Sequence, residues 1–412
     1  MTQPTCRFCR APLALDLIDL GQQPLSNAYL TRAKLDAGGE GFYPLHVRVC
    51  EQCWLVQADD PVAHDAIFDD DYAYFSSYSA SWVAHAKRYA EAMKARFGLG
   101  PSSLVAEVAS NDGYLLQHFV AMGVPVLGIE PTANTAAAAI DRGVPTEVAF
   151  FNARAAAEMK ARGIQADLMA GNNVLAHVPD IADFVAGFPI LLKSEGVLTF
   201  EFPHLLKLIE LVQFDTIYHE HFSYLSLLAV EKVLAANGMR AFDVEQLPTH
   251  GGSLRLFCAH QGASHAETPA LRDVRAAEAA AGLDTRAPYE SFTARAEAVR
   301  DGLLVFLDRA AAEGKRVAAY GAAAKGNTFL NYAGVTAPRI EAVFDANPHK
   351  QGRYLPGSHA PILAPSEVAT MRPDYLLILP WNLKDEIIGQ MATIRDWGGK
   401  FVIAVPTIEV ID

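Results

Sequence analysis

Two parts of the chain repeat one pattern, in which a short apolar run ends at small or polar residues and a longer stretch of mixed polarity follows. The apolar runs lie at 104–108, 126–129, 166–170 and 196–203 in the first part, and at 317–320, 340–344, 375–379 and 400–405 in the second. Such runs alternating with helical stretches are typical of parallel strands joined by crossover helices. The sequence therefore predicts an α/β fold, with a central doubly wound Rossmann-like domain and a second Rossmann-like domain after it.

The remaining stretches predict the units around these two domains. Residues 261–315 are rich in Ala, Glu and Arg, which favours linking helices without a site of their own. The chain is long for a single core, so several units are expected. We expect a small N-terminal module at 1–65, the central domain at 66–260, a helical linker at 261–315 and the C-terminal domain at 316–412.

Local patterns add detail to this division. Residues 42–49 predict a strand, whereas 20–25, with a glycine and a proline, predict a loop. Residues 82–97 predict an amphipathic helix. A second helix is expected from Thr132, as its cap, to Arg142, with Gly143 ending it.

The composition is that of a globular protein with an acidic balance. The 412 residues are 51% hydrophobic and 20% charged, and 34 Lys plus Arg against 47 Asp plus Glu give a net charge of −13. Nucleic acids and membrane surfaces attract positive fields, so we expect neither as a partner. Met1–Arg10 has no apolar signal core, and no run approaches the ~18 apolar residues of a membrane span, so we expect a cytoplasmic protein.

Four of the five cysteines form two knuckles, Cys6-x2-Cys9 and Cys50-x2-Cys53. Two such pairs are the usual donors of a closed tetrahedral zinc site. Disulfides are disfavoured in a reducing cytosol, and a redox Cys-x-x-Cys would not need a second copy. We expect structural zinc, which would stabilise a module too small to fold alone. Cys258, in an apolar run, is interpreted as a small buried hydrophobe.

A turn between strand and helix carries the candidate cofactor site. The strand 104–108 contains Glu107, the small residues 109–113 open a helix, and the next strand ends at Glu130, where doubly wound folds bind ribose hydroxyls. The missing Gly-x-Gly-x-x-Gly argues against a pyrophosphate here, and Glu107 suits a cationic sulfonium. We therefore expect S-adenosylmethionine, held by Glu107, Ser110, Asn111, Asp112, Gly113, Glu130, Asn172 and Asn173.

Four consecutive residues able to move or polarise a proton follow an apolar segment: Tyr218, His219, Glu220 and His221. Their side chains can converge on one pocket only from a loop or a strand end. A solvated polar turn with idle histidines is the alternative. His177 follows the carboxyl end of another strand, where open parallel sheets bind ligands, although a surface histidine also fits there.

Three further segments are candidates for substrate binding. Residues 69–79 are crowded with hydroxyls and aromatic rings, which suits a lid over a polar ligand or a packing corner. The turn at 250–252 could be a backbone cradle beside a phosphate or a plain hairpin. The turn at 321–327 could bind an anion at a helix N-terminus or carry an ordinary surface lysine. The residues concerned are Tyr72, Tyr74, Ser76, His250, Gly251, Arg255 and Lys325.

Several motifs occur together in sequence order: the two knuckles, Glu-x-Ala-Ser-Asn-Asp-Gly, Asn-Asn-Val-Leu-Ala-His-x-Pro, Tyr-x-Glu-His-Phe, His-Gly-Gly and Tyr-Gly-Ala-x-Ala-Lys-Gly-Asn. With them the chain, over about residues 5–410, resembles the sugar C-methyltransferases that act on nucleotide-linked 4-keto-6-deoxysugars. The resemblance implies such a partner, linked to dTDP or GDP. It also implies active-site roles for Tyr72, His177, Tyr218, Glu220 and His221, whereas His219 stands at a position that varies.

The implied reaction suits these residues. A C4 ketone acidifies the neighbouring C3–H, but a base with a pKa near neutrality and donors to the developing enolate are still needed. Our hypothesis is that His221 removes the proton while Glu220 orients and charges its imidazole. Tyr72 or Tyr218 would donate to the C4 oxygen, assisted by His177. Two alternatives are a nicotinamide-dependent nucleotide-sugar oxidoreductase and a non-catalytic zinc-knuckle adaptor.

Overall fold

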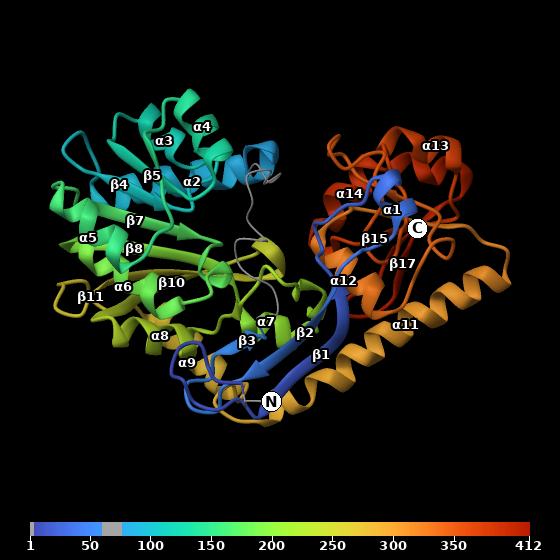
Figure 1. Cartoon of the computed structure of the whole chain (residues 1–412), viewed down its shortest axis with the longest axis horizontal. Coiled ribbons are helices and arrows are strands. Elements are labelled where there is room, and N and C mark those ends of the chain that lie inside the picture. Colours follow the sequence, from blue (N-terminus) through green and yellow to red (C-terminus); the bar gives the residue numbers. More distant parts are fainter. Residues whose placement is uncertain (1–3, 60–75) are drawn as a thin grey trace.

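A computed structural model of the chain describes residues 4–59 and 76–412, and these residues form three sheets. Figure 1 shows the central sheet on one side, the C-terminal sheet on the other, and the N-terminal strands β1 and β2 running between them. Tyr72 and Tyr74, both expected at the substrate, lie outside the described residues. Among the described helices none combines the length and the apolar character needed to cross a membrane.

The central sheet has seven strands in the order β10-β11-β8-β7-β4-β5-β6. Neighbours from β8 to β6 are parallel, and β10 and β11 form an antiparallel hairpin beside β8. This arrangement confirms the predicted α/β class. The strands are β4 (Val105–Val108), β5 (Val126–Glu130), β6 (Thr146–Val148), β7 (Ala166–Asn172), β8 (Leu192–Pro203), β10 (Met239–Leu247) and β11 (Ser253–His260).

The helices of this domain lie between the strands in the sequence and pack their apolar faces against the sheet. They are α2 (Ala80–Phe97), α3 (Leu116–Ala121), α4 (Ala133–Asp141), α5 (Ala153–Ala161), α6 (Ile181–Leu191), α7 (Leu205–Glu210) and α8 (Leu227–Ala236). Helix α2 confirms the amphipathic helix expected near 82–97. Thr132 is the N-cap residue of α4, as predicted, but its hydroxyl bonds the Glu130 carboxylate and not a helix N–H.

The C-terminal sheet has the order β14-β13-β12-β15-β16-β17, and only its last pair, β16 and β17, is antiparallel. Its strands are β12 (Val317–Tyr320), β13 (Val343–Phe344), β14 (Ile362–Leu363), β15 (Tyr375–Ile378), β16 (Lys400–Ile403) and β17 (Glu409–Ile411), with helices α12 (Ala324–Tyr332), α13 (Val368–Met371) and α14 (Lys384–Gln390). The second Rossmann-like sheet is thereby confirmed.

Helices α9 (Pro269–Ala280), α10 (Ala287–Glu290) and α11 (Phe292–Ala312) join the two larger sheets, as expected for residues 261–315. Figure 1 shows α11 as a long helix that leads from beneath the N-terminal strands to the C-terminal domain. Its buried face includes Phe292, Leu303 and Phe306, which belong to the same core cluster as residues of β1 and β12. The linker therefore packs the units into one body.

The N-terminal module is completed by a strand from far along the chain. Its sheet has the order β1-β2-β3-β9, with β1 (Leu15–Pro24), β2 (Phe42–Val49), β3 (Val56–Ala58) and β9 (Ser223–Tyr224). The loop expected at 20–25 is wrong, because β1 runs through Gly21 to Pro24 with a register shift between Asp19 and Gln22. That irregularity absorbs the turn residues while the strand continues.

The tip of this β1–β2 hairpin reaches the C-terminal domain. Helix α1 (Arg32–Ala37) lies within the tip, and Leu30 pairs with Tyr354 beside it. Glu40 accepts hydrogen bonds from the Gly357 N–H and from His359 Nε2, both at 2.8 Å. One end of the hairpin is thus held by the C-terminal domain and the other by the cysteine knuckles.

A buried carboxylate fastens the linker to the central domain. Glu278 on α9 is 3% exposed and accepts from the Leu227 and Leu228 N–H groups at 2.6 and 2.8 Å. His204 Nε2 lies 2.7 Å from the same carboxylate. Since the first N–H groups of a helix have no partner within it, Glu278 completes the capping of α8 that the Ser226 hydroxyl begins at the Ala229 N–H.

We expect Glu278→Ala to lower the free energy of unfolding by about 2–4 kcal/mol, because buried donors then lose their acceptor. Urea unfolding followed by circular dichroism measures the loss. The matched control is Glu290→Ala on the same linker, where the exposed carboxylate pairs with Arg286, and its effect should be much smaller. Equal losses in the two variants would contradict this role of Glu278.

Candidate active site

The proton-transfer loop begins with a single turn, η4 (Phe214–Thr216), and ends where β9 starts. Within it His221 Nδ1 donates to the Thr216 carbonyl at 2.9 Å. A carbonyl can only accept, so this bond places the proton on Nδ1 and leaves Nε2 with its lone pair. Burial, and next the neighbouring His177, hold the pKa of His221 well below its ordinary 6.5. The ring is a neutral base at neutral pH.

The structure brings three of the predicted residues together around this ring. The Tyr218 and His221 ring centroids lie 4.0 Å apart, and those of His177 and His221 lie 4.7 Å apart. His177 reaches the loop from η3 (Leu175–His177), just after the carboxyl end of β7. A side chain at the carboxyl end of the sheet and side chains on the loop therefore share one site. This arrangement favours a functional site over a solvated polar turn.

Two neighbours of His221 point elsewhere. The Glu220 carboxylate accepts from Asn27 Nδ2 at 2.5 Å, on the hairpin tip. The expectation that Glu220 orients and charges the imidazole is therefore wrong, because the Thr216 carbonyl holds it. His219 is 6% exposed and faces the Tyr43 ring on β2, with centroids 6.1 Å apart. The two middle residues of this tight turn therefore face the N-terminal hairpin, whereas Tyr218 and His221 face each other.

Strand β9 ties the end of the loop to the cysteine knuckles. Val56 pairs with Tyr224 and Gln57 with Ser223, and the Ala58 N–H donates to the Phe222 carbonyl at 3.1 Å. Gln57 Nε2 also donates to Cys6 Sγ at 3.2 Å. The backbone that follows His221 is thus one hydrogen-bonded step from a cysteine ligand.

The four knuckle cysteines converge as predicted. Their sulfur atoms lie within 4.8 Å of one another, with Cys6–Cys53 at 3.6 Å and Cys9–Cys50 at 3.4 Å. Sulfurs bonded to one zinc ion at about 2.3 Å in a tetrahedron are roughly 3.8 Å apart, so the arrangement fits the metal. A donor on Cys6 Sγ also suits a thiolate ligand.

The predicted cofactor turn follows β4. Ala109, Asn111 and Gly113 have φ values of 56°, 49° and 76°, and such left-handed non-glycine backbone is strained and often functional. The Asn111 N–H donates to Glu130 at 2.9 Å, and Arg142 pairs with Asp112 at 2.6 Å. The turn is therefore held in an unusual shape by Glu130 on one side and Arg142 on the other.

Unused acceptors surround this turn. Glu107 Oε2, Asp112 Oδ1, Asn172 Oδ1 and Asn173 Oδ1 are buried and have no hydrogen-bond partner among residues 4–59 and 76–412. Burial raises the pKa of Glu107 well above its usual value, and Glu130 and Asp112 add to the rise. Acceptors beside clustered acids fit a ligand with an amino group and a sulfonium, as in S-adenosylmethionine.

Two residues near this turn differ from the sequence prediction. Ser76, expected at the substrate, lies against the cofactor turn instead, where its N–H donates to Asn111 Oδ1 at 2.9 Å. Phe150 was not predicted; it follows the carboxyl end of β6 and is 55% exposed, two residues beyond the last paired residue of that strand. An exposed ring at the ligand-binding edge of the sheet could pack on a purine. An aromatic residue directly after a strand was the available signal.

The turn at 250–252 reaches the site because the β10–β11 hairpin turns beside the carboxyl end of β8. Burial, and next the charge of Lys325, lower the pKa of His250 to about 4. Gly251 has φ +87°, and a Cβ there would come within 2.2 Å of the Trp381 ring. The turn therefore makes a close contact with the C-terminal domain that needs glycine.

Arg255 does not have the predicted phosphate role. It is 5% exposed, donates to Glu201 at 2.6 Å and to Glu245 at 2.8 Å, and lies over the Tyr89 ring. His85 Nε2 lies 3.0 Å from the same Glu201 carboxylate. Sequence could not reveal this network, because its members come from α2, β8, β10 and β11. Arg255 balances a buried acid.

Lys325 lies where predicted, at the start of α12, but its ammonium group is buried. Nζ donates to Asn382 Oδ1 at 2.7 Å and lies 4.8 Å from the Trp381 ring centroid. Burial lowers the pKa of Lys325, and Asp215 of the proton-transfer loop raises it. The lysine therefore acts electrostatically on the loop.

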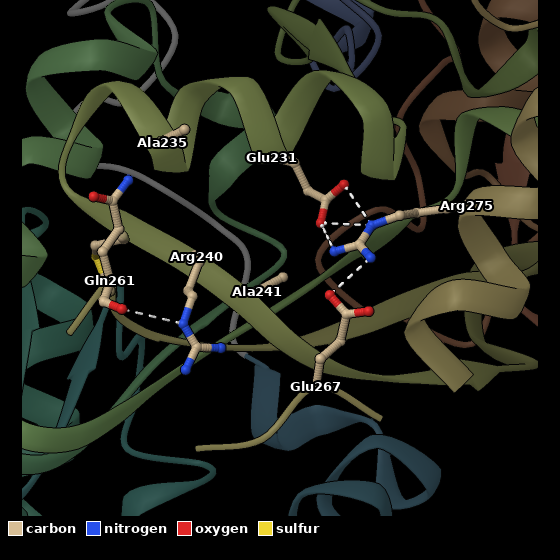
Figure 2. A pocket seen from close by; sticks show the side chains of 8 residues that line it. Glu231, Ala235, Arg240, Ala241, Gln261, Glu267 and Arg275 are labelled. Atoms are coloured by element: carbon tan, nitrogen blue, oxygen red, sulfur yellow. Dashed lines mark hydrogen bonds and ion pairs between the residues drawn. The ribbon is translucent and has the colours of Figure 1, made fainter. Parts of the chain in front are cut away.

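A separate hollow of about 270 Å³ is lined by Glu231, Ala235, Met239, Arg240, Ala241, Gln261, Glu267 and Arg275. Figure 2 shows Arg275 bridging Glu231 and Glu267, at 2.7 and 2.8 Å. The hollow lies far from the carboxyl edge of the central sheet. At that edge Ser253 pairs with Pro203, whereas Met239, which lines the hollow, pairs with His260 at the other end of β11. With its charges mutually neutralised, this hollow carries no chemistry that we can assign.

Comparison with known proteins identifies the class. Residues 248–406 match the family model "C-methyltransferase C-terminal domain", residues 82–244 match "Methyltransferase domain", and residues 6–68 match "Putative zinc binding domain". The chain is 37% identical over 406 residues to the C-methyltransferase NovU of Streptomyces niveus, covering 98% of this chain and 96% of that protein.

Solved structures are more distant. The magnesium protoporphyrin IX methyltransferase ChlM of Synechocystis PCC 6803 is 16% identical, with a TM-score of 0.36, over 43% of this chain and 83% of that chain. A methyltransferase of Clostridium acetobutylicum ATCC 824 is 12% identical, with a TM-score of 0.35, over 43% of this chain and 91% of that one. These structural similarities are too weak to support an assignment, so the family assignment rests on the sequence comparison.

The chain belongs to the C-methyltransferase family. It is an S-adenosylmethionine-dependent enzyme with an N-terminal zinc-binding module. The oxidoreductase and the non-catalytic adaptor are therefore excluded as alternatives.

We expect loss of zinc to loosen the proton-transfer loop as well as the knuckles, because β9 is held by β3. Chelation, or Cys50→Ser, should release the metal and speed amide exchange at 56–58 and at 217–224, measured by mass spectrometry. Cys258→Ala, which alters a buried cysteine outside the cluster, should keep its zinc. Unchanged exchange at 217–224 after metal loss would contradict the coupling.

Proposed function

We propose that this enzyme transfers a methyl group to C3 of a nucleotide-linked 4-keto-6-deoxysugar through an enolate. The observation that carries the proposal is the neutral His221 ring, whose Nδ1 is held by the Thr216 carbonyl beside Tyr218 and His177. Carbon acids next to a ketone need such a base. The sugar and its nucleotide are proposed from the motif resemblance.

The proposed reaction begins when His221 Nε2 takes the C3 proton and the electron pair moves onto the C4 oxygen. Among the residues that the structure describes, Tyr218 is the nearest phenol to His221, and it donates to the developing enolate oxygen, with His177 as a second donor. Residues near Glu107 and Glu130 would hold S-adenosylmethionine, which would supply the methyl group. The electron pair of the enolate would form the C3–CH3 bond as the sulfonium S–CH3 bond breaks, leaving S-adenosylhomocysteine and restoring the C4 ketone. His221 becomes an imidazolium that the Thr216 carbonyl still holds through Nδ1–H.

The role of the C-terminal domain in this proposal is to hold the nucleotide. The carboxyl ends of β12, β13 and β15 meet at one edge, as in ligand-binding open sheets. Asp345 follows β13 and accepts from the Ala322 N–H at 2.8 Å, and Lys350 lies 3.6 Å from Asp345. This edge supplies a carboxylate and a cation for the ribose and phosphates of either dTDP or GDP.

We expect His221→Gln to abolish exchange of the C3 hydrogen with deuterated solvent while S-adenosylmethionine still binds. The loss should be 10²-fold or more, the order of a removed general base. Proton NMR of the nucleotide sugar follows exchange, and isothermal titration calorimetry measures cofactor affinity.

The matched control is His219→Gln, which alters the adjacent imidazole that faces Tyr43 and should retain exchange. Retained exchange in His221→Gln would refute the base assignment. Absence of exchange and methylation with the wild-type enzyme on every 4-keto-6-deoxysugar nucleotide tested would refute the substrate.

The pH dependence should show a base with a lowered pKa. Because burial, His177, His250 and Lys325 all disfavour the protonated ring, His221 stays neutral as the pH falls through its ordinary 6.5. We expect kcat/KM to remain level across that value and to fall only at lower pH. An acid limb centred at or above 6.5 in a kcat/KM profile would show that the base is not this ring.

A further inference from the structure

Asp215 is a buried acid that the proposed reaction does not use. It lies in η4, directly before Thr216, and is 1% exposed. Its Oδ2 accepts from Trp381 Nε1 at 2.7 Å, whereas Oδ1 has no partner among the described residues. Burial raises the pKa of Asp215 to about 6, and Lys325 opposes the rise. The loop that carries the base is thus fastened through a carboxylate to a residue of another domain.

Trp381 touches both segments that bring histidines to the site. It begins η7 (Trp381–Leu383), after the carboxyl end of β15. Its ring packs so tightly on Gly251 that a Cβ there would clash, and Gln213 Nε2 donates to the Gly251 carbonyl at 2.9 Å. One indole therefore contacts the His250 turn while its N–H holds the His221 loop.

Helix α12 reinforces this contact. Thr328 Oγ1 donates to the Ile217 carbonyl at 2.8 Å, and the Phe329 and Phe214 rings meet with centroids 5.3 Å apart. At the start of the same helix, Lys325 lies over the indole and bonds Asn382, the residue after Trp381. The C-terminal domain thereby contacts the loop through the buried Thr328 and Phe329 and through the partly buried Trp381.

We propose that Asp215, Trp381 and Lys325 form an interdomain clasp through which the C-terminal domain positions the His221 loop and the His250 turn for proton transfer. They are positioning residues, because they act on the base through the loop backbone and through charge. The expected changes in kcat rest on the proposed function, whereas the expected changes in amide exchange do not. It differs from the expectation that Lys325 holds a diphosphate.

The first test separates the hydrogen bond from the packing. Trp381→Phe keeps a ring on Gly251 but removes the donor to Asp215, and Asp215→Asn keeps an acceptor where Asp215→Leu has none. We expect Trp381→Phe and Asp215→Leu to lower kcat at least tenfold, to leave cofactor affinity within twofold, and to speed amide exchange at 214–222 and 249–252. Asp215→Asn should retain most of the amide protection.

The matched control is Trp397→Phe, which removes another indole N–H bond in the same domain, to the Pro373 carbonyl at 3.0 Å. It should change neither kcat nor exchange in the loop. Wild-type exchange rates at 214–222 in both Trp381→Phe and Asp215→Leu would overturn the clasp. Should Trp381→Phe fail to fold, the difference between Asp215→Asn and Asp215→Leu decides in the same way.

The second test concerns the charge of Lys325. Within residues 4–59 and 76–412, the ionisable groups facing His221 are His177, His250, Lys325 and the phenols of Tyr218 and Tyr224, and those facing His250 also include Glu201 and His85. Only the lysine carries a fixed positive charge from the C-terminal domain into this group.

Lys325→Met removes that charge, so we expect the acid limb of kcat/KM to move to higher pH while KM for the nucleotide sugar stays within twofold. Lys315→Met, at an exposed lysine of the same domain paired with Asp374, is the control and should leave the profile unchanged. A rise in KM without movement of the acid limb would overturn this role and favour a phosphate ligand.

Failure of the clasp and failure of the proposed function give different results. Amide exchange needs no substrate, so looser loops in Trp381→Phe support the clasp even if no 4-keto-6-deoxysugar is methylated. Methylation by the wild-type enzyme with unchanged exchange in the variants supports the reaction and overturns the clasp.

Discussion

The hydrogen bond from His221 to the Thr216 carbonyl is the contact on which the rest of the site depends. A carboxylate in that position would fix the same tautomer but would also favour the protonated ring. A neutral carbonyl fixes the tautomer alone, so the buried imidazole keeps an accessible lone pair. Because the acceptor belongs to the backbone, the position of the ring is set by the shape of the loop. Whatever holds the loop therefore holds the proposed base.

Three sheets share that task. The cysteine module pairs its β3 with β9 just after the loop, the central sheet supplies His177 and the His250 turn, and the C-terminal domain contributes Trp381 and Thr328. No long helix or strand runs through residues 214–224 to stiffen them. Short elements gain order here from packing against several rigid neighbours, which suits a site that must hold its groups closely.

The architecture was largely predictable, because hydrophobic periodicity and composition indicate helices and strands that are longer than a few residues. Both large sheets, the linking helices and the cysteine cluster follow from such local signals, whereas the gathering of His177, Tyr218 and His221 was implied by the motif resemblance. The two-residue strand β9 has no detectable pattern, and the bulged β1 looked like a loop because its turn residues sit inside a strand. The partners of Glu220 and Arg255 were missed because each lies far along the chain, where spacing carries no information.

The β1–β2 hairpin has a consequence for how such enzymes change over time. It is held by cysteines at one end and by Tyr354 and His359 at the other, and Asn27 near its tip bonds Glu220 of the loop. The N-terminal module therefore contacts both larger domains through residues that are far apart in the sequence. Recombination that exchanged one unit between relatives would break these contacts, so we expect the three units to be inherited together.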